Sequence, residues 1–128
     1  MPKSVIMCVD DEQLVLDTLE IELQKAFGDR YDYEFAESAE EALEVIEELN
    51  DDHIKILIIV SDWLMPGMKG DDFLITVHQQ LPKVVKIMLT GQADEDAIER
   101  AQHQANLHRC LFKPWNSKDL IDTIRASL

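Results

Sequence analysis

Short apolar runs at intervals along the chain constrain its fold more than any other feature. Residues 5–9, 56–60, 84–89 and 110–112 form such runs, and residues 33–36 form a weaker one. They are too short for helices and rich in β-branched and other apolar residues, which is typical of strands buried on both faces of a parallel sheet. Helix-period segments separate them, so the chain consists of repeated strand and helix units.

Apolar stripes at helical spacing fill the gaps between the runs. Gly28 is a plausible stop for the first helix, and Pro82 follows the third. Ser38 and Glu41 form a capping box at the start of the second helix, with Ser38 as the N-cap. In chain order, the stripes consist of Leu16, Leu19, Leu23, Ala26 and Phe27; Ala42, Leu43, Ile46 and Leu49; Phe73, Leu74, Val77 and Leu81; Ala93, Ala97, Ile98, Ala101 and Ala105; and Leu120, Ile121, Ile124 and Leu128.

These elements predict an α/β fold with one domain over residues 1–128. We expect a (βα)5 unit, a doubly wound five-stranded parallel sheet in the flavodoxin-like order 2-1-3-4-5 with right-handed crossovers. Small residues dominate the fourth stripe, so its helix should pack thinly and move easily. The sequence leaves open whether the domain stands alone or is a fragment of a longer protein.

The composition excludes several classes of protein. Hydrophobic residues make up 46% of the 128 residues, which suits one core. No apolar stretch approaches the about 20 residues of a membrane span, and the N-terminus lacks a signal-peptide core. We therefore expect a cytoplasmic protein without a membrane partner. A formal net charge of -14 argues against direct contact with nucleic acid, which basic surfaces bind.

Neither the cysteines nor the histidines indicate a site. Cys8 and Cys110 fall inside predicted strands without metal-ligand spacing, so we interpret them as reduced core residues. The histidines lack mutual spacing and catalytic context. We expect all of them at the surface: His53, His78, His103 and His108.

Polar residues follow the apolar runs at the points where the predicted strands end. Asp10 and Asp11 follow the first run, Asp62 the third, Thr90 the fourth and Lys113 the last. Because ligands of such sheets bind outside the carboxyl ends of the strands, we expect these side chains to meet. Two carboxylates about 4 Å apart repel by roughly 4 kcal/mol, so the cluster requires cations. Lys113 supplies one, and oxygen-only ligands with room for water favour Mg²⁺ as the other.

Each of these residues also has a simpler interpretation. Asp10 and Asp11 could be a turn and N-cap before a helix that starts near Glu12. Asp62 could be an ordinary turn aspartate, because proline and glycine crowd the segment after it. It is the joint occurrence of these residues, in order and after the right strands, that is specific.

Over essentially all of its length, the chain resembles the receiver domain of two-component response regulators. The resemblance is carried by VDDE at residues 9–12, SDWLMPGMKG at 61–70, LTG at 89–91 and FKPW at 112–115. It implies that Asp62 accepts a phosphoryl group from a sensor histidine kinase or phosphotransfer protein. It also implies that Asp11, Asp62 and the backbone carbonyl of Leu64 hold Mg²⁺, with Asp10 acting through a bound water.

The resemblance assigns the remaining residues to the response. Thr90 would hydrogen-bond the phosphoryl oxygens, and Lys113, preceding a cis proline bond, would pair with them. Receivers commonly carry an aromatic residue three positions before this lysine, where Cys110 stands here, so the aromatic readout is missing. Leu64 and Gln92 border the approach of hydrolytic water, and apolar Leu64 predicts a long-lived phosphorylated state.

Three other functions stay open at this point. A haloacid-dehalogenase-type phosphatase would need a second aspartate two residues after its nucleophile, where Glu12 follows Asp10. A flavodoxin-like cofactor binder would need a phosphate loop rich in hydroxyl groups and glycine. A receiver-fold interaction module would bind partners without being phosphorylated. We expect a signalling domain that turns over no substrate; its output partner, and whether it forms a homodimer, are open.

Overall fold

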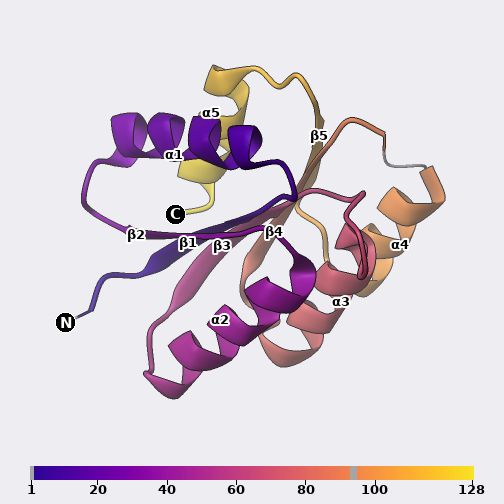
Figure 1. The fold of residues 1–128 in the computed structure, drawn as a ribbon, viewed down its shortest axis with the longest axis horizontal. Helices are drawn as coiled ribbons and strands as arrows, with labels where there is room; N and C mark the ends of the chain where they lie inside the picture. The colour runs from indigo at the N-terminus through magenta and orange to yellow at the C-terminus, as the bar shows by residue number, and fades with distance from the viewer. Residues whose placement is uncertain (1, 93–94) are drawn as a thin grey trace.

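A computed structural model describes residues 2–92 and 95–128 and contains a parallel sheet in the order β2-β1-β3-β4-β5 (Figure 1). The predicted fold class and strand order are confirmed. Each strand end lies within one residue of its predicted position. The strands are β1 (Val5–Val9), β2 (Asp32–Ala36), β3 (Ile56–Ser61), β4 (Val85–Thr90) and β5 (Arg109–Phe112).

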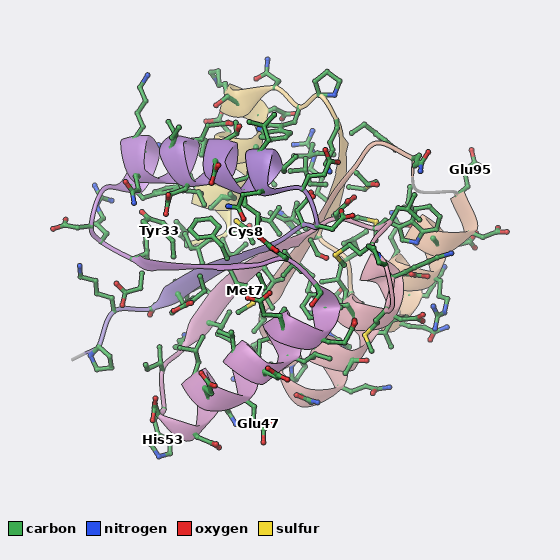
Figure 2. The ribbon with its side chains drawn as sticks, in the orientation of Figure 1. Met7, Cys8, Tyr33, Glu47, His53 and Glu95 are labelled. Atoms are coloured by element: carbon green, nitrogen blue, oxygen red, sulfur yellow. The ribbon has the colours of Figure 1, made fainter. Side chains whose placement is uncertain are left out.

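Helices cover both faces of the sheet. In Figure 1, α1 and α5 lie on one face, and α2, α3 and α4 lie on the other. Met7 and Cys8 of β1 accordingly point to opposite sides, Met7 toward α2 and Cys8 toward α1 (Figure 2). Burial on both faces is why the central strands β1, β3 and β4 are nearly continuous apolar runs, whereas the edge strands β2 and β5 keep polar, exposed residues. The helices are α1 (Gln13–Phe27), α2 (Ala39–Asp51), α3 (Gly70–Gln80), α4 (Glu95–Gln104) and α5 (Ser117–Ala126).

The predicted helix ends are largely confirmed. Gly28 follows α1 with a φ of 60°, a conformation that favours glycine, and its N–H donates to the Gln24 carbonyl. At the start of α2, the Ser38 hydroxyl accepts the N–H of Glu41 at 3.1 Å. The second half of the capping box is wrong, because the Glu41 carboxylate reaches one residue further back and accepts the N–H of Glu37 at 3.1 Å.

Two predictions of burial are wrong. Leu128 lies beyond the end of α5, where the apolar stripe no longer faces the sheet, and it is 43% exposed. His78 on α3 is half-buried, and its Nδ1 is a buried atom without a hydrogen-bond partner among the described residues. The other histidines are exposed as expected. Ala93, assigned to the fourth stripe, lies outside the described residues.

No helix in the described parts of the chain is both long enough and apolar enough to cross a bilayer.

Candidate functional site

The structure brings the polar residues that follow the strands together at the carboxyl edge of the sheet. One carboxylate oxygen from each of Asp10, Asp11 and Asp62 lies within 4.8 Å of the others. Asp10 and Asp62 are buried and Asp11 is exposed. Thr90, the last residue of β4, is fully buried. The backbone N–H of Lys113 donates to the Thr90 carbonyl at 3.0 Å, which holds the ends of β4 and β5 together.

Lys113 is the cation of the cluster. Its Nζ donates to Asp10 Oδ2 at 2.7 Å and lies 3.4 Å from Asp62 Oδ2. Glu12 lies further out, with its Oε1 3.7 Å from the same ammonium group. The Lys113–Pro114 peptide bond is cis, as the resemblance implied.

The buried ion pair changes the proton affinities of both partners. Burial raises the pKa of the Asp10 carboxyl above its ordinary value, and hydrogen bonds from Lys113 and from the N–H of Glu12 offset part of this effect. Burial by itself would lower the pKa of Lys113. The hydrogen bond and charge of Asp10, together with Asp62, outweigh burial and raise the Lys113 pKa. The ammonium group is therefore firmly charged.

The donor set fits a hard divalent cation. All three clustered side chains offer carboxylate oxygens, which are the ligands of Mg²⁺ and Ca²⁺, and no nitrogen or sulfur ligand belongs to the group. One ammonium beside three carboxylates leaves a net negative charge that a divalent ion would neutralise. The acidic pocket is thus compatible with Mg²⁺.

The simpler interpretation of Asp10 and Asp11 is confirmed for the turn and wrong for the N-cap. The N-cap of α1 is Glu12, whose side chain makes no capping hydrogen bond. Asp10 Oδ1 instead accepts the N–H of Glu12 at 2.9 Å, while its Oδ2 faces Lys113. The local turn and the cluster therefore use different oxygens of the same carboxylate.

The residues expected to tune the site flank it. Leu64 lies two residues after Asp62 and is 39% exposed. Gln92 is exposed, and its N–H contacts the Thr90 hydroxyl at 3.4 Å. Cys110 is half-buried and packs against the core beneath α2, α3 and α4. Cys110 pairs in register with Met88, two residues before Thr90.

Sequence reasoning missed Gly70, the first residue of α3. A Cβ at this position would clash with the Asp62 carbonyl oxygen and lie 2.8 Å from Trp63 Cα. The N–H of Gly70 donates to the Trp63 carbonyl at 2.7 Å, so the loop after Asp62 closes tightly on itself. The only signal in the sequence was a glycine in a segment already rich in proline and glycine.

A doubly wound sheet with a carboxylate cluster and a lysine at its carboxyl edge defines a receiver-type signalling module. Residues 6–125 match the family described as response regulator receiver domain. The chain belongs to this family. Family membership argues against the phosphatase and flavodoxin-like alternatives.

Two relatives that match nearly the whole chain have different names: a transcriptional regulatory protein and a sensor kinase. The chain is 27% identical over 126 residues to the hydrogenase transcriptional regulatory protein HoxA of Cupriavidus necator, covering 98% of this chain and 24% of HoxA. It is 32% identical over 126 residues to the sensor kinase CckA of Brucella abortus, covering 98% of this chain and 12% of CckA. The chain therefore spans about a quarter or less of the length of these two relatives.

Solved structures are similar over nearly the whole chain. The signal receiver domain of an HD domain-containing protein from Pseudomonas fluorescens superimposes with a TM-score of 0.84 at 28% identity, covering 98% of this chain and 94% of that one. A CheY-like response regulator receiver domain protein from Methanospirillum hungatei gives 0.85 at 28% identity, covering 97% and 92%.

Proposed function

We propose that this chain is a phosphoacceptor receiver domain in which Asp62 accepts a phosphoryl group from a histidine kinase or phosphotransfer protein. One observation carries the proposal. The Lys113 ammonium lies 2.7 Å from Asp10 and 3.4 Å from Asp62, within a group of three carboxylates at the carboxyl edge of the sheet. Phosphoryl transfer depends mostly on positioning and charge neutralisation, and this arrangement supports both.

The contacts of the two oxygens of Asp62 support attack by Oδ2. Its Oδ1 already accepts the N–H of Trp63 at 2.8 Å, whereas Oδ2 faces Lys113. Asp62 Oδ2 would attack the phosphorus and form a new O–P bond while the bond from phosphorus to the donor breaks. The donor leaves with the bonding electron pair, as acetate when the donor is acetyl phosphate. Hydrolysis by water later restores the carboxylate and releases inorganic phosphate.

Mg²⁺ would supply positive charge to the transferring phosphoryl group. Asp11, Asp62 and the Leu64 carbonyl would hold it directly, and Asp10 through a water. Lys113 would pair with the phosphoryl oxygens, and Thr90 would donate its hydroxyl to them. The added charge of about two units would then reorder the neighbouring segments, as phosphorylation generally does.

The proposed output is an interaction with another protein. HoxA is named a transcriptional regulatory protein and CckA a sensor kinase, so receivers of this kind accompany different outputs. We infer a shared phosphoryl input from a kinase, received by a single domain over residues 1–128. The formal net charge of -14 supports an output through another protein surface and not through direct contact with DNA.

Acetyl phosphate and Mg²⁺ test the assignment directly. The wild-type protein should gain the mass of one phosphoryl group, and Asp62→Asn should gain none, because an amide is not a nucleophile of this kind. Asp72→Asn is the matched control, since it removes an exposed carboxylate on α3 and should label normally. Labelling of Asp62→Asn at full stoichiometry would contradict the nucleophile, and absence of labelling in wild type would favour the unphosphorylated interaction module.

A further inference from the structure

Helix α4 is held to the rest of the domain by few side chains. Its buried residues are Ala97 and Ala101, which offer little apolar area, and Ile98 packs partly against the core. Arg100 makes polar contacts from α4 to α3. Its Nη1 lies 3.0 Å from Asp71 Oδ2 and 2.6 Å from Asp72 Oδ1. Arg100 is therefore one of the few side chains that join α4 to α3.

Asp71 connects this arginine to the loop after the phosphoacceptor. Asp71 is only 8% exposed, and each of its oxygens has a partner. Oδ1 accepts the indole N–H of Trp63 at 3.1 Å, and Oδ2 accepts Arg100. A buried carboxylate that loses one such partner is strongly destabilised, so Trp63 and Arg100 are coupled through it. By contrast, Asp72 is exposed and contacts Arg100 from the solvent side.

Trp63 links Asp71 to Asp62, because it forms hydrogen bonds with both residues. Its backbone N–H donates to Asp62 Oδ1 at 2.8 Å, and its carbonyl accepts the N–H of Gly70 at 2.7 Å. The Lys69 ammonium lies 5.2 Å from the centre of the indole ring. Both the backbone and the side chain of Trp63 are thus fixed, and a displacement at Asp62 reaches Asp71 through a single residue.

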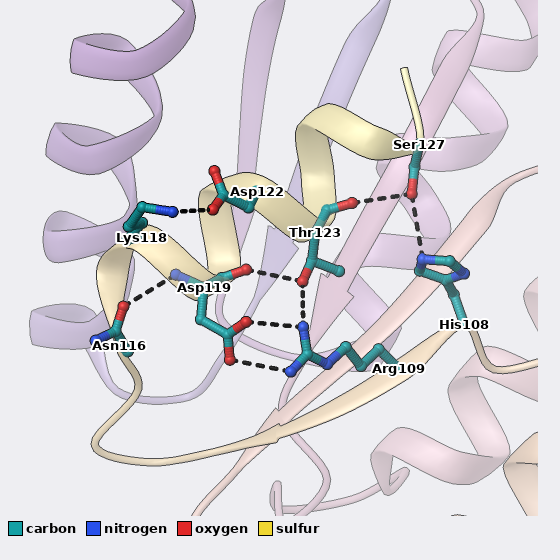
Figure 3. A network of polar contacts seen from close by, with 8 residues as sticks. All are labelled: His108, Arg109, Asn116, Lys118, Asp119, Asp122, Thr123 and Ser127. Carbon is teal, nitrogen blue, oxygen red and sulfur yellow. Dashed lines mark hydrogen bonds and ion pairs between the residues drawn. The ribbon is translucent and has the colours of Figure 1, made fainter.

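Helix α5 is attached quite differently. Arg109 of β5 donates through both terminal nitrogens to Asp119, at 2.9 and 3.0 Å, and through Nη1 to Thr123 at 2.6 Å (Figure 3). Ser127 continues the network, donating to the Thr123 carbonyl at 3.0 Å and lying 3.4 Å from His108 Nε2. This network fixes α5 to β5 and leaves α4 as the helix whose attachment runs through the phosphoacceptor loop.

We propose that the contacts Trp63–Asp71–Arg100 couple phosphorylation of Asp62 to the position of α4. The inference rests on the proposed function. When Oδ2 bonds to phosphorus, the remaining oxygen of Asp62 becomes the carbonyl oxygen of an acyl phosphate and accepts hydrogen bonds more weakly than a carboxylate. The hydrogen bond from the Trp63 N–H to Asp62 should therefore weaken, and the loop between β3 and α3 should shift. Because Asp71 contacts both Trp63 and Arg100, this shift should also move Arg100 and with it α4. This route replaces the aromatic readout that Cys110 lacks.

Backbone amide shifts measured with and without beryllofluoride and Mg²⁺ test the coupling. In wild type, the mimic of the phosphoryl group should shift amides after Asp62 and along α4. Arg100→Gln, which removes the ion pair from a half-exposed position, should keep the shifts near Asp62 and lose most of those in α4. Trp63→Phe keeps a ring but lacks the indole N–H, and should behave in the same way. Asp72→Asn is the control and should retain the α4 response.

The outcomes separate the two proposals. If wild type shows no bound beryllofluoride by fluorine resonance, the proposed function fails. If Arg100→Gln and Trp63→Phe bind the mimic and α4 shifts as in wild type, the coupling is wrong while the proposed function stands. Comparing the ligand-induced change, and not the resting spectrum, distinguishes coupling from a purely structural role, because a structural role would alter both states alike.

Discussion

At the scale of single residues, Lys113 supplies the positive charge that offsets repulsion among the carboxylates of the metal-free site. Asp10 and Asp62 are buried beside each other, and the ammonium group contacts both. Unit charges about 5 Å apart interact by roughly 3 kcal/mol at an effective dielectric near 20, so one cation offsets only part of the repulsion among three carboxylates. The folded metal-free protein therefore retains unfavourable electrostatic energy at this edge.

Asp62→Asn should consequently stabilise the metal-free protein by on the order of 1 kcal/mol. The amide oxygen can still accept the N–H of Trp63, so the local hydrogen bond is kept while one negative charge is removed. Thermal unfolding in EDTA measures the effect. An Asp62→Asn variant with a melting temperature below that of wild type would contradict the electrostatic account.

Lys113→Ala should have the opposite effect without metal. Removing the partner of buried Asp10 should cost about 3 kcal/mol, because the carboxylate loses its ion pair. Mg²⁺ should then raise the melting temperature more in Lys113→Ala than in wild type, since the ion meets less competing positive charge. Equal increases in both proteins would mean that the ion does not bind next to Lys113. Lys118→Ala, which removes an exposed lysine, is the control.

Leu64 should control how long the phosphoryl group survives. Leu64 lies two residues after Asp62 and is 39% exposed, and its apolar side chain offers no hydrogen bond that could position the attacking water. Leu64→Asn should accelerate the loss of phosphate by roughly tenfold, equivalent to about 1.4 kcal/mol of barrier. The first-order decay of phosphorylated protein in excess Mg²⁺ gives the rate. A slower or unchanged decay would place the control of water elsewhere.

At the scale of elements, the loop between β3 and α3 depends on a glycine that touches backbone. A side chain at Gly70 would meet the Asp62 carbonyl oxygen, and the backbone there cannot move without shifting Asp62. Gly70→Ala should therefore destabilise the fold by about 1–3 kcal/mol and slow phosphorylation. Gly91→Ala is the control for stability, because no heavy atom lies within 4 Å of its added Cβ. Chemical denaturation and acetyl phosphate labelling measure the two effects.

What the sequence could predict followed from local periodicity. The central strands β1, β3 and β4 are predictable because they are buried on both faces, and the clustering of Asp10, Asp62 and Lys113 follows from parallel strand direction. The contact of Arg100 with Asp71 had no local signal, because 29 residues separate the partners and both look like ordinary surface charges. Gly70 is required because its backbone lies close to the backbone of Asp62 and Trp63, and such a contact cannot be recognised from the amino-acid composition of the segment. Leu128 kept its helical spacing although the helix had ended.

At the scale of the whole molecule, acidic residues occur at both edges of the sheet. Asp10, Asp11 and Asp62 cluster at the carboxyl edge, while Asp32 begins β2 and Asp51 ends α2 shortly before β3. The formal net charge is -14, so general screening by salt stabilises the fold to some extent. A specific metal effect must therefore be separated from ionic strength.

Millimolar Mg²⁺ should raise the melting temperature of wild type beyond the effect of sodium chloride at equal ionic strength. Binding to the folded form alone produces this difference, since the carboxylates are gathered only there. Asp11→Asn removes the exposed carboxylate of the cluster and should lose most of the excess, whereas Asp51→Asn, at the far end of α2, should keep it. Equal stabilisation by both salts would argue against a metal site.

The pair formed by Asp10 and Lys113 joins residues 103 positions apart, which directly follow the first and the last strand. No shorter stretch of the chain contains both the carboxylate cluster and its lysine. The cluster is therefore complete only once β5 has joined the sheet. On the proposed function, an incompletely folded chain should be a poor acceptor of phosphoryl groups, although it already contains Asp62.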